Sequence, residues 1–192
     1  MDNVYYLIQN TLPVAIPLLL VALGGMFSER SGVINLALEG IMLFGAFFGC
    51  LLTYVIEGTG LNPQIILVLA MLVAGLAGVI FSFLLSFAAI KMKADQTITG
   101  TALNMLVPAI VLLFSKMFFM GDGITTDTNF YLKSVPGLSK IPVLGELFFQ
   151  NTYITVYIGI LLLIVTTIVF YKTIYSLRFS ACVEHPHAAD SD

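Results

Sequence analysis

The chain has 192 residues, of which 59% are hydrophobic and 10% are charged, and its mean hydropathy is +1.01. A soluble globular domain carries about 25% charged residues because its surface faces water, so this composition excludes that class and indicates a membrane protein. Eight Lys and Arg residues against eleven Asp and Glu residues give a net charge of -3, and no basic run is longer than Lys91-Met92-Lys93, which argues against nucleic-acid binding.

Five apolar stretches are long enough to cross a bilayer as helices. A crossing takes about 20 mainly apolar residues, because in hydrocarbon each backbone N–H and C=O group must be paired within the helix. The first span contains Pro13 and Pro17, so we expect it to be bent or broken. The fold class is therefore an all-α, polytopic transmembrane bundle that forms a single membrane domain over residues 1–192. The predicted spans are Leu12–Phe27, Val33–Ile56, Ile65–Ile90, Ile98–Met120 and Tyr153–Tyr171.

The positions of the positive residues predict an N-terminus outside the cell and a C-terminus inside. With this orientation five positive residues lie on the inner side and three on the outer side, and positive residues collect on the cytoplasmic side of membranes. The long loop at residues 121–152 is then external, and its apolar half predicts a short interfacial helix, which either caps the bundle or docks a partner. The inner residues are Arg30, Lys91, Lys93, Lys172 and Arg178, and the outer ones are Lys116, Lys133 and Lys140.

Polar residues that hydrocarbon should exclude gather at the start of the second span, in FSERSGVINLALEG, residues 27–40. Asn35 and Glu39 are four residues apart, so we predict that they share one helix face. A charge at mid-bilayer costs about 3 kcal/mol on insertion scales, so such residues carry either function or a specific pairing. Two interpretations fit: a polar face or broken helix that lines a translocation path, or an interhelical hydrogen-bond clamp.

A second polar group, KMKADQTITGTALN, covers residues 91–104 and leads into the fourth span. Thr99 and Asn104 belong to it, and Gly100 and Pro108 weaken regular helix there. One interpretation is a pore lining. The other is a helix cap by Asp95, followed by threonines that bond to their own backbone.

Small residues predict close contacts between helices. The second span contains a GxxxG spacing, and the third contains glycines and serines along one side. Small side chains allow two helices to approach closely in a membrane, so we predict packing rather than chemistry at these positions. They are Gly45, Gly49, Gly75 and Gly78.

The sequence contains few of the motifs that carry catalysis. No GxxxxGK[ST] phosphate loop occurs, so the chain alone is not expected to hydrolyse ATP and no cofactor is expected in it. Both histidines, His185 and His187, lie in the C-terminal tail, and no intramembrane protease pair or metal cluster is predicted. Proton relay through Glu39 keeps a secondary transporter or a channel subunit as an alternative.

Three segments carry a family resemblance: ERSGVINLALEGIMLFGAF, KADQTITGTALN and ACVEHPHAAD. Together they resemble the inner-membrane permease subunits of ABC importers in the branched-chain amino acid and simple sugar superfamily, and most of all the nucleoside or purine uptake permeases that work with a Bmp-type lipoprotein. The tail is similar to the coupling loop of that family, AxGENPxAA, with His185 where Asn is common and Val183 where Gly is usual. Family members continue beyond this loop with further helices, so the chain resembles an N-terminal part of a permease.

The resemblance implies a subunit of the bacterial cytoplasmic membrane that works by alternating access. Its implied partners are an ABC ATPase, which holds the ATP, a second permease and an extracytoplasmic substrate-binding lipoprotein, and residues 172–192 form the cytoplasmic coupling segment. A transport-incompetent piece of a permease is a further alternative. The candidate path residues, chosen from the two polar groups, are Asn35, Glu39, Thr99 and Asn104. The candidate coupling residues are Arg178, Ala181, Glu184, Pro186, Ala188 and Ala189.

Overall fold

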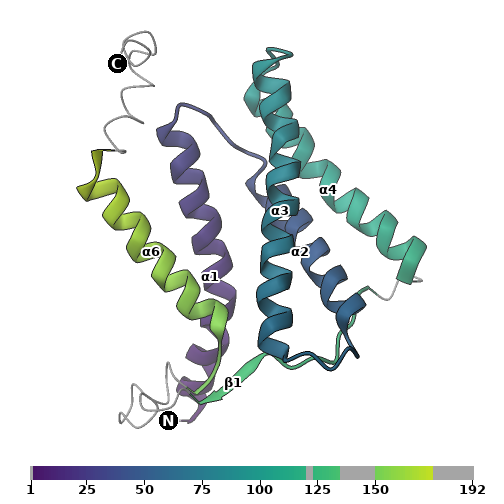
Figure 1. The fold of residues 1–192 in the computed structure, drawn as a ribbon. Coiled ribbons are helices and arrows are strands. Elements are labelled where there is room, and N and C mark those ends of the chain that lie inside the picture. The colour runs from purple at the N-terminus through teal and green to yellow at the C-terminus, as the bar shows by residue number, and fades with distance from the viewer. Residues whose placement is uncertain (1, 120–122, 135–149, 175–192) are drawn as a thin grey trace. The chain divides into compact units, whose positions relative to one another are not determined.

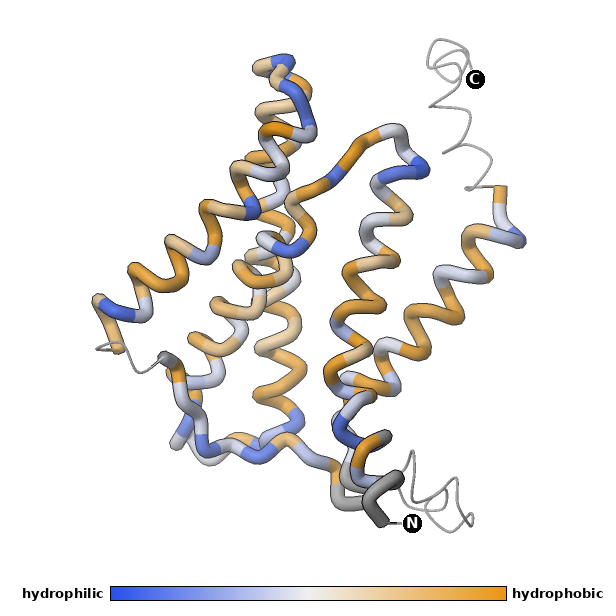
Figure 2. Tube along the Cα trace, turned by 180° about the vertical axis from the view of Figure 1, so that it is seen from behind, coloured by the Kyte–Doolittle hydropathy of each residue, from blue (hydrophilic) through white to orange (hydrophobic). Residues whose placement is uncertain are grey.

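The computed structural model describes residues 2–119, 123–134 and 150–174 (Figure 1). Within these residues five helices are long and apolar enough to cross a membrane, which confirms the prediction of a helical, multi-pass membrane protein. Figure 2 shows hydrophobic residues along these helices and hydrophilic residues mainly near their ends. The helices are α1 (Asp2–Arg30), α2 (Leu38–Ile56), α3 (Pro63–Ile90), α4 (Gln96–Phe119) and α6 (Ile154–Lys172).

Two expectations about the spans are wrong. The expectation of a broken first span is wrong, because helix α1 continues through Pro13 and Pro17, and these prolines only remove two N–H donors. Helix α2 begins at Leu38, whereas the apolar run predicted a start at Val33. The chain leaves α1 through Gly32, whose φ of +78° is open mainly to glycine, and residues 33–37 are not helical.

The chain forms two compact units, residues 33–129 and residues 2–32 with 130–174. In the first unit α3 runs antiparallel to α2, because Gly49 lies against Ala70 and Gly45 lies against Ala74. Helix α4 runs parallel to α2, because the rings of Phe47 and Phe114 are 6.4 Å apart and those further along, Tyr54 and Phe119, are 5.2 Å apart. This unit therefore contains three consecutive helices of alternating direction.

In the second unit α1 and α6 pack in parallel. Ile16, which is buried, lies against Gly159, and eleven residues further along both helices the rings of Phe27 and Phe170 are 4.4 Å apart. The guanidinium of Arg30 lies over the same Phe170 ring, 5.2 Å from its centre, within the range of a cation–π interaction. The C-terminal ends of the two helices are therefore held together.

A short hairpin, which the sequence did not predict, precedes α6. Strand β1 (Tyr131–Ser134) pairs antiparallel with β2 (Gln150–Tyr153), and Tyr131 lies opposite Tyr153 with their rings 4.3 Å apart. Burial, together with the Tyr131 hydroxyl, raises the pKa of Tyr153 to about 12, so this hydroxyl stays protonated at neutral pH. The predicted interfacial helix falls mostly on residues 135–149, which lie outside the described residues.

Candidate functional site

The N-terminus of α2 lies part-way along α3, not at its end. Ile41 packs against Gly78, which is twelve residues before Ile90, or about 18 Å along the helix at 1.5 Å per residue. Helix α3 has 28 residues, so it is about 42 Å long and exceeds the roughly 30 Å hydrocarbon core by about 12 Å. Even if all of this excess lies at the Ile90 end, the first turn of α2 is inside the hydrocarbon.

The non-helical segment before α2 therefore leads to a helix start at membrane depth. In hydrocarbon an unpaired N–H group costs several kcal/mol, so the backbone of residues 33–37 and of the first α2 turn needs partners from side chains. Asn35 supplies one of them, since its Oδ1 accepts a hydrogen bond from Ala37 N at 3.0 Å. Ala37 itself has no exposed surface.

Helix α4 supplies two more partners from a single stripe of residues. Gln96 Oε1 accepts a hydrogen bond from Ile34 N at 3.0 Å, and Asn104 Oδ1 accepts one from Gly40 N at 2.5 Å. Between them lies Gly100, four residues from each and buried. Because residues four apart share a helix face, the three form one stripe that faces the segment.

Close packing accompanies these hydrogen bonds. A Cβ atom added to Gly100 would lie 3.1 Å from Leu36 Cβ and 3.3 Å from Ala37 N, and one added to Gly40 would lie 2.9 Å from Asn104 Oδ1. Real Cβ atoms seldom approach other atoms so closely. Glycine at both positions therefore lets the uncoiled segment lie directly on α4.

The predicted path residues differ in their placement. The expectation that Asn35 and Glu39 share a helix face is wrong, because Asn35 precedes α2 and is committed to a turn. Glu39 is exposed in the first turn of α2. Thr99 donates a hydrogen bond to Asp95 O at 2.8 Å, and Asn104 binds the backbone of α2, as described above.

The start of α4 follows one of the two sequence interpretations. Asp95 Oδ1 accepts hydrogen bonds from Thr97 N at 2.8 Å and Ile98 N at 3.1 Å, so it caps the helix. Thr101 donates to Thr97 O at 2.7 Å, as threonines do when they bond to their own helix. Capping of α4 and contact with residues 34–40 thus explain the polar residues at the start of α4.

Three of the four glycines predicted at helix contacts lie against a neighbouring helix. A Cβ atom at Gly45 would lie 2.7 Å from Ala74 O, one at Gly49 would lie 3.3 Å from Ala70 O, and one at Gly78 would lie 3.3 Å from Ile41 Cγ2. Gly75 does not share this role within the described chain, where no atom comes within 4 Å of such a Cβ. Gly75 directly follows Ala74, and successive residues of a helix point in directions about 100° apart, so Gly75 does not face the α2 backbone as Ala74 does.

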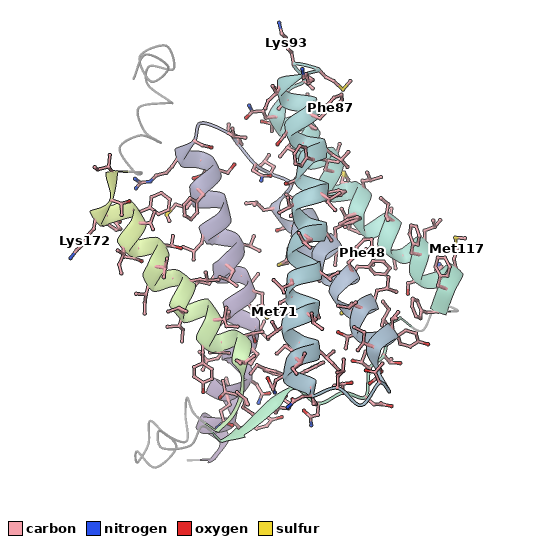
Figure 3. The ribbon with its side chains drawn as sticks, in the orientation of Figure 1. Phe48, Met71, Phe87, Lys93, Met117 and Lys172 are labelled. Carbon is pink, nitrogen blue, oxygen red and sulfur yellow. The ribbon has the colours of Figure 1, made fainter. Side chains whose placement is uncertain are left out.

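An apolar groove of about 530 Å³ opens between α2 and α4 beyond the Gly40–Asn104 contact. Phenylalanine side chains dominate it, and Figure 3 labels Phe48, which belongs to its α2 wall. No polar group in the described lining can fix the orientation of a polar ligand. The lining residues are Phe44, Phe47, Phe48, Leu51, Ile110, Phe114, Phe118 and Phe119.

A third polar contact, missed from the sequence, fixes the chain beyond α4. Glu57, directly after α2, accepts hydrogen bonds through Oε1 from Asp127 N at 2.6 Å and from Thr128 Oγ1 at 2.8 Å. Its seventy-residue separation from these partners leaves no local sequence signal. This carboxylate ties the segment after α4 to the α2–α3 turn.

The predicted coupling residues lie outside the described residues. These are Arg178, Ala181, Glu184, Pro186, Ala188 and Ala189. Among the residues that the structure does describe, no group of three His, Cys, Asp or Glu side chains could hold a metal ion.

The similarity to known proteins extends over almost the entire chain. The chain is 41% identical to the "guanosine ABC transporter permease protein NupQ" of Bacillus subtilis over 96% of the chain's own length. It is 33% identical to the "nucleoside ABC transporter permease protein NupC" of Lactococcus lactis over 99% of the chain. It is 30% identical to the "putative glucose ABC transporter permease protein TsgC13" of Haloferax volcanii over 96%.

The chain spans only part of these relatives, namely 58%, 59% and 54% of their lengths in the same order. No solved structure matches significantly. The family model described as "branched-chain amino acid transport system / permease component" matches residues 7–191. Since this match covers nearly all of the sequence, the chain belongs to that family of permease components.

Proposed function

We propose that the chain is part of the permease subunit of an ATP-driven ABC importer that takes up nucleosides. The similarity to two permeases named for guanosine and for nucleosides carries this proposal, because it extends over 96% and 99% of the chain. The relative named for glucose is less similar, at 30% identity, so nucleosides are favoured over sugars as the substrate class.

The distribution of positive residues favours an N-terminus outside and a C-terminus inside, and five alternating spans put the two ends on opposite sides. Helices that cross a membrane in succession alternate in direction, which agrees with parallel α2 and α4, antiparallel α3, and parallel α1 and α6. Four positive residues then share one side, and a cytoplasmic location for that side follows from the charge rule. They are Arg30, Lys91, Lys93 and Lys172, of which Figure 3 labels the last two.

For the translocation path, we assign the polar contacts with substrate to residues in the first turn of α2 and just before it. Glu39 is exposed, and Asn35 is half-buried with its amide NH2 group not used in the turn bond. Uncoiled backbone at membrane depth is tolerated where it faces protein or a cavity, which fits a path beside residues 33–39. Thr99 lies on the α4 side of the same region and is half-buried.

Energy would come from a separate ATPase that acts on the predicted coupling segment. Closure of the ATPase dimer would press on residues 184–189 and change the side to which the path opens, while an extracytoplasmic lipoprotein delivers the substrate and a second permease completes the bundle. The absence of a phosphate loop in the sequence supports the assignment of ATP hydrolysis to a partner.

Uptake of labelled guanosine into proteoliposomes tests the proposal. The complete permease, assembled with its partners, should accumulate guanosine only with ATP on the side of the ATPase, and Glu184→Lys should leave ATP hydrolysis but abolish uptake. Equal uptake without the ATPase subunit would instead identify a secondary transporter or channel. Comparison of the 192-residue chain with a longer version tests whether this part transports anything by itself.

A further inference from the structure

Residues 34–40 and the first half of α4 match each other in register. Going along both segments in the same direction, Ile34 meets Gln96, Leu36 and Ala37 meet Gly100, and Gly40 meets Asn104. The described backbone of residues 34–36 has no helical bonds of its own, so its position depends on this one face of α4.

The side chains of Gln96 and Asn104 each supply an oxygen acceptor, which in a continuous helix would be a backbone carbonyl. Gln96 Oε1 and Asn104 Oδ1 each accept a backbone N–H bond, at 3.0 Å and 2.5 Å. Each therefore replaces a carbonyl that the non-helical chain lacks at this depth. This use commits one lone pair of Asn104 Oδ1 to the protein chain and thereby fixes the orientation of the side chain.

We infer that Gln96, Gly100 and Asn104 are positioning residues: they fasten the uncoiled segment before α2 to α4, so that the two move as one element while the path alternates. This inference rests on the proposed transport function, and it reassigns Asn104 from contact with substrate to support of the residues that make it. Asn35 and Glu39 are then presented from a segment whose place is fixed by α4.

The first test asks whether Gln96 and Asn104 position the segment before α2 or contact the substrate directly. Asn104→Leu and Gln96→Met keep the approximate size of the side chain but remove the oxygen that accepts the hydrogen bond. Asn104→Asp and Gln96→Glu retain this acceptor oxygen. A carboxylate at position 104 also suits the N-terminus of α2. Thr101→Val is the matched control, because Thr101 is exposed on the same helix and bonds only to Thr97 O among the described residues.

In the complete transporter, loss of the acceptor should lower the maximal rate of guanosine uptake about tenfold, as expected when a backbone N–H group loses its partner, with KM changed less than about twofold. The variants that retain the acceptor should recover most of the rate. An increase in KM for Asn104→Leu at an unchanged maximal rate would overturn the inference, as would rates for both acceptor-less variants equal to that of Thr101→Val.

The second test asks whether segment and helix move together. Leu36→Cys with Gly100→Cys, in a background of Cys50→Ala and Cys182→Ala, places two Cβ atoms 3.1 Å apart. This is a few tenths of an ångström less than in disulfides, so a small outward shift of the segment permits the cross-link. We expect the oxidised pair to cross-link and to retain at least about half of the uptake of the reduced pair. Uptake that is lost on oxidation and restored by a reductant would show that the two separate during transport, and failure to cross-link would refute their contact.

The two proposals fail in different ways. If the unmodified complete transporter shows no ATP-dependent guanosine uptake, the proposed function is wrong. The cross-link, by contrast, reports the contact between residues 36 and 100 whatever the substrate.

Discussion

The contact between α2 and α3 offers a sharp test of the packing. At Gly45 an added Cβ would lie 2.7 Å from the backbone oxygen of Ala74, while ordinary contacts begin at 3.4 Å. The shortfall of about 0.7 Å cannot be relieved by a side-chain rotation, because the obstructing atom belongs to the α3 backbone, so the helices must separate. Gly45→Ala is therefore expected to destabilise the chain.

Gly75→Ala is the matched control for this substitution. It makes the same chemical change in a neighbouring helix, where no described atom lies within 4 Å of the new Cβ. Both substitutions gain up to about 1 kcal/mol in helix propensity, and only Gly45→Ala has an overpacking cost of about 1–3 kcal/mol. The difference between the two variants removes the shared gain and leaves about 1–3 kcal/mol for the clash.

Unfolding of the 192-residue chain by SDS in mixed micelles, followed by far-UV circular dichroism, measures this difference. We expect Gly45→Ala to unfold at lower SDS than the unchanged chain, and Gly75→Ala to unfold at the same or higher SDS. If Gly45→Ala proves as stable as Gly75→Ala, the close approach of α2 and α3 at this position is refuted.

Three further outcomes follow from contacts in the same unit. Asp95→Ala should lower the unfolding free energy by about 0.5–2 kcal/mol through loss of the α4 cap, whereas Asp95→Ser should restore most of it in the same SDS titration; equal effects would contradict the cap. Glu57→Ala should increase hydrogen exchange at the Asp127 amide about tenfold or more, measured by mass spectrometry, and unchanged exchange would show that the carboxylate does not hold this segment. Phe81→Ala should cost about 3–5 kcal/mol, since that ring is 3% exposed, whereas Phe83→Ala, at a ring that is 70% exposed, should cost far less; similar losses would argue against the assigned core.

The apolar runs predict most of the fold because hydrocarbon imposes a simple rule on the backbone. A stretch such as Ile65–Ile90 has one way to pair all its peptide groups, and the corresponding helix, Pro63–Ile90, agrees closely with it. The start of α2 could not be found in this way. Residues 33–37 are apolar enough for helix, and a partner of their uncoiled backbone, Gln96, lies sixty-two residues away from Ile34.

The candidate site shows the same division between local and distant causes. An Asp95 cap is one of the two interpretations that the sequence offers, because its partners are two and three residues away. It also marks Asn104 as informative, but its role depends on Gly40, which comes close only after three helices have packed. The spacing of Gln96, Gly100 and Asn104 was the available signal, since residues at intervals of four form one stripe.

Cysteine labelling of intact cells tests the threading of the chain most directly. In a background of Cys50→Ala and Cys182→Ala, Thr59→Cys lies in the α2–α3 turn and Lys93→Cys lies in the α3–α4 turn, at opposite ends of α3. A membrane-impermeant maleimide should label Thr59→Cys in intact cells and should reach Lys93→Cys only after the cells are opened. The reverse pattern would contradict the assigned orientation, and equal labelling of both sites in intact cells would contradict the crossing itself.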